Sequence, residues 1–264
     1  MKASKLKLSV FGVLLSCITI LNAQEESSNS ETRYVTFGFY KVDENKRSDY
    51  ETLMTDYFGP LMQKRVNEGC LAGWLFRKVL PNSSLYNEFT HLTIDIMPYG
   101  EKTYQSCDAK LEEVFEGLSA NLRKFVWKQK NSFRQVILRA QTTSVTGFKE
   151  PEKTPKIAVY NFTKTLTPMY EKKHLDNFGE FIVTSSSRIA WYAFKRIDPT
   201  AWASKEWDYL TVDGYENLQQ LNEPSNFPQV KIEYYNNKYG LGSEQRDIMG
   251  RAVTELIFET KTRQ

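Results

Sequence analysis

Acid–base chemistry near neutral pH is the first possibility that the sequence offers. His91 can gain or lose a proton near pH 7, and Asp95 follows two pleats later on the same side of any strand through this stretch. The segment returns 118 residues later with Tyr209 and Asp213 in the corresponding places. We therefore predict catalytic roles for His91, Asp95, Tyr209 and Asp213. Either His91 or Tyr209 would be the acid or base, and the aspartates would orient it. A hydrogen-bonded structural histidine is the alternative.

Aromatic residues near these positions suggest a binding surface. Two of them lie in one predicted strand and two in its later counterpart, and Trp207 lies two residues before Tyr209. Such rings can stack on an aromatic or sugar-ring ligand, although they more often form a core. The predicted ligand-binding residues are Trp74, Phe76, Tyr192, Phe194 and Trp207.

Basic residues also recur at matching places. Lys41 corresponds to Lys164 near the end of a strand, and Arg139 corresponds to Arg251 in the last strand of each half. Surface ion pairs are the ordinary interpretation of such residues. Alternatively, one pair at the mouth of a barrel could hold an anionic substrate.

The sequence gives no sign of a metal or a cofactor. Its two histidines are His91 and His174, and it contains no Cys-x-x-Cys spacing, so we predict no metal site. His174 follows a charged segment and is expected at the surface. No phosphate-binding glycine loop, Gly-x-Ser-x-Gly or His-Glu-x-x-His is present, so we predict no cofactor and find no support for nucleotide, hydrolase or zinc-protease chemistry.

Alternating and helical patterns predict the elements that must position these residues. Residues 34–42, 71–80, 88–96 and 138–145 have the composition of strands. Apolar residues at helical spacing predict helices over 50–66 and 111–125, with a kink or a late start at Pro60. The predicted order is β-α-β-β-α-β.

The same pattern then starts again, which indicates an internal duplication. Phe37–Lys41 is echoed by Tyr160–Lys164, Tyr50-Glu51 by Tyr170-Glu171, and Phe76–Pro81 by Phe194–Pro199. Five such matches occur in the same order along the chain. Between 217 and 244 no clean helical stripe is present, so a broken helix or a loop is expected there.

The fold class predicted is α+β, with two tandem ferredoxin-like βαββαβ units packed sheet to sheet as one barrel. The third strands would place Leu92, Ile94, Leu210 and Val212 under helices and the catalytic candidates in the lumen. This duplicated unit resembles the dimeric α/β-barrel superfamily, which includes antibiotic-biosynthesis-monooxygenase-like, EthD-like and NIPSNAP-like proteins. The resemblance covers about residues 33–263 and rests on element order and duplication.

The resemblance implies a barrel pocket for a small apolar or aromatic molecule. It also implies a cofactor-independent oxygenase or isomerase, and the alternative is a non-catalytic small-ligand or sugar-binding protein. Because no family motif matches residue by residue, it assigns no catalytic residue. Chlorite-dismutase-like haem proteins also carry two such units, but they need a haem-binding histidine, for which only His91 and His174 are available.

The N-terminus is predicted to be a secretory signal over residues 1–23, followed by a flexible leader over 24–32. Lysines precede the apolar run Leu8–Ile20, and Ala23 offers a cleavage site. A lipoprotein anchored through Cys17 is the alternative. We expect a secreted or periplasmic protein without a transmembrane segment after cleavage, with units at 33–148 and 157–264 and a linker at 149–156.

Charge and cysteines complete the prediction of partners. The full chain has 35 Lys and Arg against 32 Asp and Glu, and three of the lysines lie in the predicted signal, so the mature chain is close to neutral. A near-neutral chain does not favour nucleic acid as a partner, and the partner predicted is a small-molecule ligand. Export would permit a disulfide between Cys70 and Cys107, with two separate thiols as the alternative. The oligomeric state is not predicted.

Overall fold

The computed structural model describes residues 32–102, 111–115, 119–150, 153–175, 178, 187–198, 207–223, 229–240 and 242–261. The predicted signal and all but the last residue of the predicted leader lie outside these ranges. No helix in the described ranges has the length and apolar character needed to cross a membrane. Cys70 is disulfide-bonded, and its partner lies outside the described residues.

The first half has the predicted order of elements. Its strands are β1 (Tyr34–Val42), β2 (Gly73–Val79), β3 (His91–Ile96) and β4 (Arg134–Lys149). Its helices are the short η1 (Glu44–Lys46), α2 (Arg47–Leu53), the π-helical η2 (Met54–Phe58), α3 (Gly59–Asn67), α4 (Leu111–Val114) and α5 (Ala120–Phe133). The chain is helical without a break from Arg47 to Asn67, so the helix does not start late at Pro60; the interruption there is the π-helical η2, which directly precedes Gly59 and Pro60.

The second half has β5 (Ile157–Thr165), β6 (Ala190–Arg196), β7 (Tyr209–Tyr215) and β8 (Arg246–Glu259). A π-helical segment, η3 (Tyr170–Leu175), follows β5. The stretch before β8 contains three separate helices, α7 (Leu218–Asn222), α8 (Gln229–Tyr239) and α9 (Gly242–Gln245), as the absence of a continuous stripe indicated. The division into units at 33–148 and 157–264 stays a prediction.

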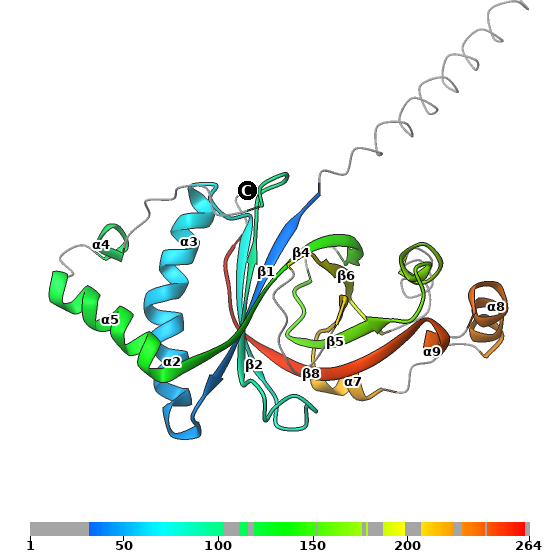
Figure 1. Ribbon diagram of the computed structural model, residues 1–264. Coiled ribbons are helices and arrows are strands. Elements are labelled where there is room, and N and C mark those ends of the chain that lie inside the picture. Colours follow the sequence, from blue (N-terminus) through cyan, green and yellow to red (C-terminus); the bar gives the residue numbers. More distant parts are fainter. Residues whose placement is uncertain are drawn as a thin grey trace, which may run out of the picture. The chain divides into compact units, whose positions relative to one another are not determined.

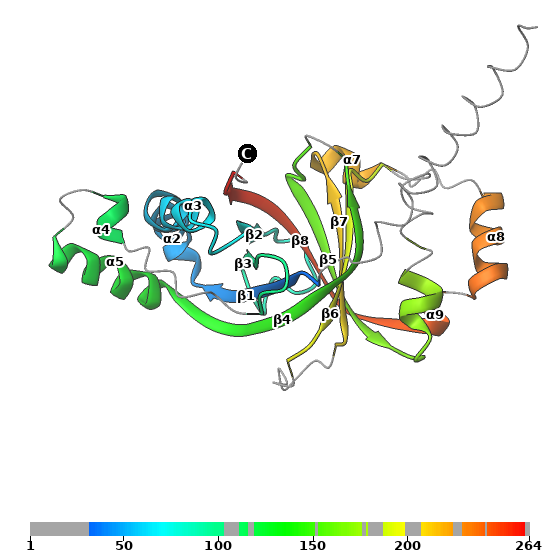
Figure 2. The same ribbon diagram turned by 90° about the horizontal axis from the view of Figure 1, so that it is seen from above.

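The strands form a closed antiparallel barrel in the order β1-β3-β2-β8-β5-β7-β6-β4 (Figures 1 and 2). The order is β4-β1-β3-β2 within the first half and β8-β5-β7-β6 within the second. Two pairings, β2 with β8 and β4 with β6, close the ring between the halves. An α+β fold with a closed eight-stranded barrel is thus confirmed.

The lumen of the barrel is filled by apolar side chains from both halves. Phe37 lies against Tyr160 and Phe194, with ring centroids 6.3 and 5.2 Å apart, and Phe39 lies 5.5 Å from Phe162. The buried residues of this cluster, called the lumen core below, are Val35, Phe37, Phe39, Val79, Leu85, Phe89, Leu92, Ile94, Leu138, Ala140, Ala158, Tyr160, Phe162, Trp207, Leu210, Val212 and Ala252. The described residues therefore form a largely apolar core where the sequence suggested a lumen pocket.

The two faces of the third strands are the reverse of the prediction. Leu92, Ile94, Leu210 and Val212 belong to the lumen core, whereas His91 and Tyr209 face the helical side, against Tyr50 and Tyr170. The alternation was predicted correctly, but the face that carries His91 and Tyr209, which is aromatic and polar together with Phe89 and Trp207, was assigned to the lumen. Phe89 and Trp207 do lie in the lumen core, yet they precede the strands, which begin at His91 and Tyr209. Because they lie outside the strands, the side that they face does not determine the side that the strand residues face.

The strand pairing aligns β2 with β6 in a register that differs by one residue from the sequence match. Lys78 pairs with His91, and Lys195 pairs with Tyr209, so Trp74 corresponds to Trp191 and Arg77 to Phe194. The echo Phe76–Pro81 with Phe194–Pro199 is therefore out of step by one residue. Since side chains alternate between the two faces, this shift puts Trp74 and Phe76 on the helical side and Tyr192 and Phe194 in the lumen.

A buried arginine links the two halves at the seam between β2 and β8. Arg77 is 2% exposed. Its Nε donates to Thr254 Oγ1 (2.9 Å), and its Nη2 donates to the carbonyl oxygens of Pro155 (3.1 Å) and Lys156 (3.0 Å). These bonds engage the Nε and Nη2 donors of the buried guanidinium and fix the backbone that leads into β5.

Candidate functional site

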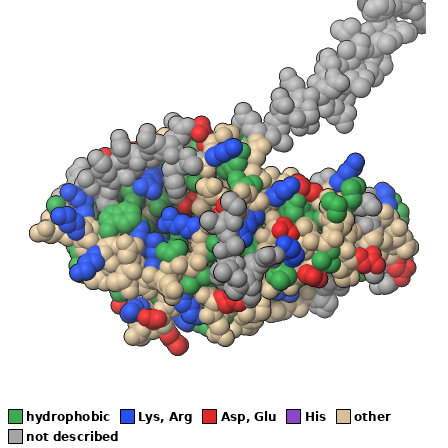
Figure 3. All heavy atoms as spheres, viewed as in Figure 1, with side chains coloured by type: hydrophobic (Ala, Val, Ile, Leu, Met, Phe, Trp, Pro, Cys, Tyr) green, Lys and Arg blue, Asp and Glu red, His purple; other side chains and the backbone are tan. Residues whose placement is uncertain are grey.

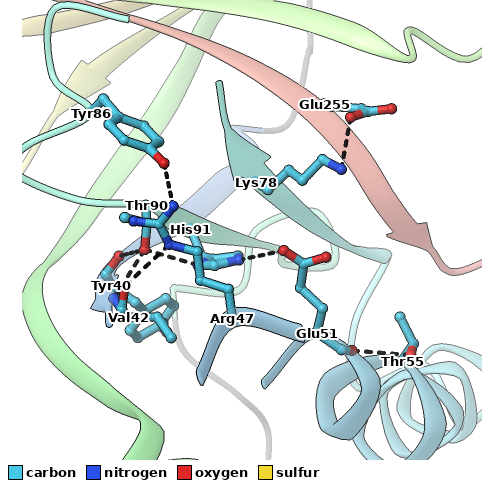
Figure 4. Close-up of polar contacts among 10 residues, drawn as sticks. All are labelled: Tyr40, Val42, Arg47, Glu51, Thr55, Lys78, Tyr86, Thr90, His91 and Glu255. Atoms are coloured by element: carbon cyan, nitrogen blue, oxygen red, sulfur yellow. Dashed lines mark hydrogen bonds and ion pairs between the residues drawn. The ribbon is translucent and has the colours of Figure 1, made fainter. Parts of the chain in front are cut away.

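His91 is buried between the sheet and α2. Its side chain is 1% exposed, and its ring lies 5.2 Å from that of Tyr50 and 5.6 Å from that of Phe76. Figure 4 shows the ring between Glu51 of α2 and Thr90 at the start of the strand. The His91 Nε2 lies 3.1 Å from Glu51 Oε1, and its Nδ1 lies 3.0 Å from Thr90 Oγ1.

The protonation of this group follows from its surroundings. Burial lowers the pKa of His91, so the imidazole is neutral at pH 7. A carboxylate can only accept, so the proton is on Nε2 and is donated to Glu51, while Nδ1 accepts from the Thr90 hydroxyl. That hydroxyl oxygen also accepts from the Val42 N–H (3.0 Å). Both ring nitrogens are engaged, so His91 attaches α2 to the sheet, as the structural alternative stated.

The charged groups around this histidine are paired as well. The hydrogen bond from His91 holds the pKa of Glu51 below its usual range. Lys78 lies 3.0 Å from a carboxylate oxygen of Glu255, and Arg47 donates to the hydroxyl of Tyr86 (Figure 4). Nothing in this group offers a free acid or base.

Tyr209 occupies the corresponding position in the second half. Its hydroxyl donates to Glu171 Oε2 (2.6 Å), and Lys195 Nζ donates to the same oxygen (2.7 Å). Burial raises the pKa of Tyr209, and the bond to the carboxylate raises it further. Tyr209 is therefore a hydrogen-bond donor that attaches η3 to the sheet, and it is a poor base.

The predicted aspartates do not orient these groups. Asp213 is 5% exposed, accepts from Arg188 Nε (2.7 Å) and from Asn161 Nδ2 (3.0 Å), and lies in an ion pair. His91 bonds to Glu51 and Thr90 rather than to Asp95. The structure thus places His91, Asp95, Tyr209 and Asp213 on the helical side without bringing any two of them together as an acid–base pair.

The predicted ligand-binding aromatics are core residues. Trp74 and Phe76 pack in the cluster under α2, η2 and α3. Tyr192 and Phe194 pack against the lumen core, to which Trp207 belongs. Each of the five therefore has a packing role, which was the alternative stated for them.

The sequence analysis overlooked Lys130, in the last turn of α5. It is 8% exposed, and its Nζ lies 3.7 Å from the ring centroid of Trp127 and 4.1 Å from that of Phe58. Burial lowers its pKa to about 7, and the nearby charges of Arg134 and Arg139 act in the same direction. A large part of Lys130 is thus a neutral amine at neutral pH.

Lys130, Arg134 and Arg139 are called the Lys130 cluster below. In the described part of the chain no carboxylate lies within ion-pair distance of any of the three. Arg134 lies over the ring of Tyr40, with Cζ 4.0 Å from its centroid. Figure 3 shows Lys and Arg side chains beside apolar ones between α5 and the barrel. The cluster combines positive charge, aromatic rings and a titratable amine, which suits a small aromatic molecule with developing negative charge.

Part of this cluster could have been found in the sequence. Lys124, Lys128, Lys130, Arg134 and Arg139 follow each other closely, and no acidic residue lies among them. Such a run is ordinarily a solvated face. The lowered pKa of Lys130 arises from burial and from charges on β4, which only the tertiary structure supplies.

No group of three or more potential metal ligands occurs in the ranges described. The side chain of His174, in η3, lies outside the described residues.

Comparison with solved structures finds this fold in proteins of very different sequence. A monooxygenase-like protein from Lactobacillus acidophilus has a TM-score of 0.50 at 8% identity, over 88% of this chain and 97% of that chain. A second, from Fusobacterium nucleatum, has a TM-score of 0.50 at 12% identity, over 89% and 100%. An anthrone oxidase-like protein has a TM-score of 0.48 at 12% identity, over 89% and 95%.

Neither a protein-family model nor a curated protein matches the sequence. At such low identities the likeness to solved structures establishes the fold alone. The chain thus has the closed eight-stranded α+β barrel fold found in these monooxygenase-like structures.

Proposed function

We propose that this protein binds a small aromatic molecule at the Lys130 cluster and oxidises it with dioxygen without a bound cofactor. The observation that carries the proposal is a buried lysine, packed against two aromatic rings, beside two arginines that have no ion-paired carboxylate among the described residues. Burial lowers the pKa of this lysine to about 7. The likeness of the fold to monooxygenase-like structures supports it only as an analogy.

The chemistry requires a base and a way to hold an anion. Neutral Lys130 would take a proton from a C–H group flanked by aromatic rings, and Arg134 and Arg139 would stabilise the resulting substrate anion. The anion then gives electrons to dioxygen. A methylene substrate and one dioxygen molecule would give one ketone and one water. One oxygen atom enters the ketone, and the other leaves in the water together with the two methylene hydrogens.

Oxygen uptake with anthrone as the probe tests this proposal, because its methylene is acidified by the flanking rings and carbonyl. We expect Lys130→Met to lower kcat by about 100-fold or more, as removal of a general base does. Lys128→Met, at an exposed position on the same helix, should leave the rate unchanged. In the wild type the rate should fall as the pH drops below about 7, because protonation removes the base. Equal rates for the two variants would contradict the proposal.

Binding without turnover is the second candidate, and one observation favours it. The rings of Trp127 and Phe58 next to Lys130 Nζ stabilise the ammonium form, which binds anions but cannot act as a base. In that case anthrone or a related aromatic would bind, while oxygen uptake would not rise above the rate in buffer.

We also propose that the mature protein begins near Gln24 and is exported. The lysine-rich start, the apolar run and Ala23 support this, and the disulfide at Cys70 suits an oxidising compartment. Intact-mass measurement of the protein from its native host should give the chain from Gln24. A mass that includes a lipid on Cys17 would instead make it an anchored lipoprotein.

We propose, finally, that the two halves are copies of one ferredoxin-like unit. Their equal strand order and the repeated attachment of a helical glutamate to His91 or Tyr209 support a duplication. Superposition of the two sheets tests it, since β3 should align with β7 so that His91 matches Tyr209.

A further inference from the structure

The second half of the chain provides an internal comparison for the Lys130 cluster. Arg139 of β4 pairs with Gly38 of β1, and Arg251 of β8 pairs with Asn161 of β5 in the same relation. Asn161 Oδ1 accepts from Arg251 Nε at 3.0 Å. Gly38 has no side chain to offer, so Arg139 lacks the acceptor that its counterpart has. Arg139 is also exposed, so a ligand can reach it.

Arg134 has an unused donor of its own. Its Nη1 lies 3.4 Å from the Tyr50 hydroxyl, but its Nε is buried and has no acceptor among the described residues. Buried donors are nearly always satisfied, so an orphaned one points to an acceptor that the chain itself does not supply. The guanidinium lies over the Tyr40 ring, with its Cζ 4.0 Å from the ring centroid, which restricts the plane in which its N–H groups can donate.

Resting on the proposed function, we infer that the aromatic molecule bound at the Lys130 cluster carries a carboxylate, held by Arg134 and Arg139. The edge of a guanidinium presents two parallel N–H donors at the spacing of the two carboxylate oxygens. No carboxylate of the described residues is ion-paired with these arginines, although the charge of Asp95 acts on Lys130. A bound carboxylate would offset part of the guanidinium charge, whereas burial, the largest cause of the lowered pKa of Lys130, would remain.

Direct binding measurements with three matched probes test the inference. Calorimetric titration would compare 2-naphthoate, 2-naphthalenemethanol and 2-naphthyl phosphate on the intact mature chain. We expect 2-naphthoate to bind at least about 10-fold more tightly than the alcohol, with an affinity that falls as salt rises. In Arg139→Gln this preference should disappear. Lys128→Gln removes one positive charge at an exposed place on α5 and should keep it.

The outcomes separate this inference from the proposed oxygenase. Equal binding of acid and alcohol by the wild type, or a preference that survives Arg139→Gln, would overturn the inference, whatever the oxygen uptake. Tighter binding of the phosphate than of the naphthoate would overturn the assignment of a carboxylate. A preference for naphthoate that depends on Arg139, together with no oxygen uptake, would uphold the inference and remove the oxygenase.

Discussion

Residues 33–148 expressed alone are expected to remain unfolded in dilute buffer. The first half contributes Phe37, Phe39, Leu92 and Ile94 to the lumen core, and the surfaces that bury them include Tyr160, Phe162 and Phe194 of the second half. Without the second half this apolar sheet face would be exposed to water, and the strands β2 and β4 would lose their partners β8 and β6. The hydrophobic stabilisation of the half would therefore be largely lost.

Circular dichroism and urea unfolding of the half chain, with residues 33–264 as the control, would measure this. We expect a sharp cooperative transition for the control and none for the half. Mixing residues 33–148 with 153–264 should restore part of the structure, because the lumen core can then form between the two pieces. A cooperative transition for residues 33–148 alone would show that the lumen core is not needed for folding.

Truncation of Phe39 is expected to destabilise the whole barrel by about 3 to 5 kcal/mol. Phe39 is fully buried, and its ring centroid lies 4.9 Å from that of Phe89 and 5.5 Å from that of Phe162. In Phe39→Ala a cavity would remain between residues of both halves, so both should lose stability together. The unfolding free energy from urea titration would therefore fall, while the transition stays single.

Ile248→Ala is the matched control for this measurement. Ile248 lies in β8 but is 53% exposed, so its truncation should change the unfolding free energy by less than about 0.5 kcal/mol. Two separated transitions in Phe39→Ala would indicate that the halves unfold independently and would contradict a shared core.

Alternation and helical spacing were enough to predict most of this fold. The strand of Tyr34–Val42, the broken helix before β8 and the closed barrel follow from local patterns and from the ordered matches along the sequence. The side of the sheet that each residue of β3 and β7 faces could not be predicted in this way. Alternation shows which residues share a side, but it does not show whether that side is the lumen or the helical side. The face with His91 and Tyr209 was assigned to the lumen because it is aromatic and polar together, whereas these two residues pack against Tyr50 and Tyr170 on the helical side.

The candidate site was harder to predict than the fold. His91 and Tyr209 attracted attention as titratable groups, but their partners Glu51 and Glu171 come from helices far away in sequence. Lys130 looked like one of several lysines on a helix. Its lowered pKa depends on Phe58 and Trp127 beside it and on arginines of β4, and only the folded chain brings these groups together.

The pairings of β2 with β8 and of β4 with β6 also decide how the protein responds to dilution. A barrel assembled from two separate chains is held by an association equilibrium, so it dissociates as its concentration falls. Here both halves of the ring belong to one polypeptide, and its closure is intramolecular. The barrel's folded fraction should therefore not depend on protein concentration.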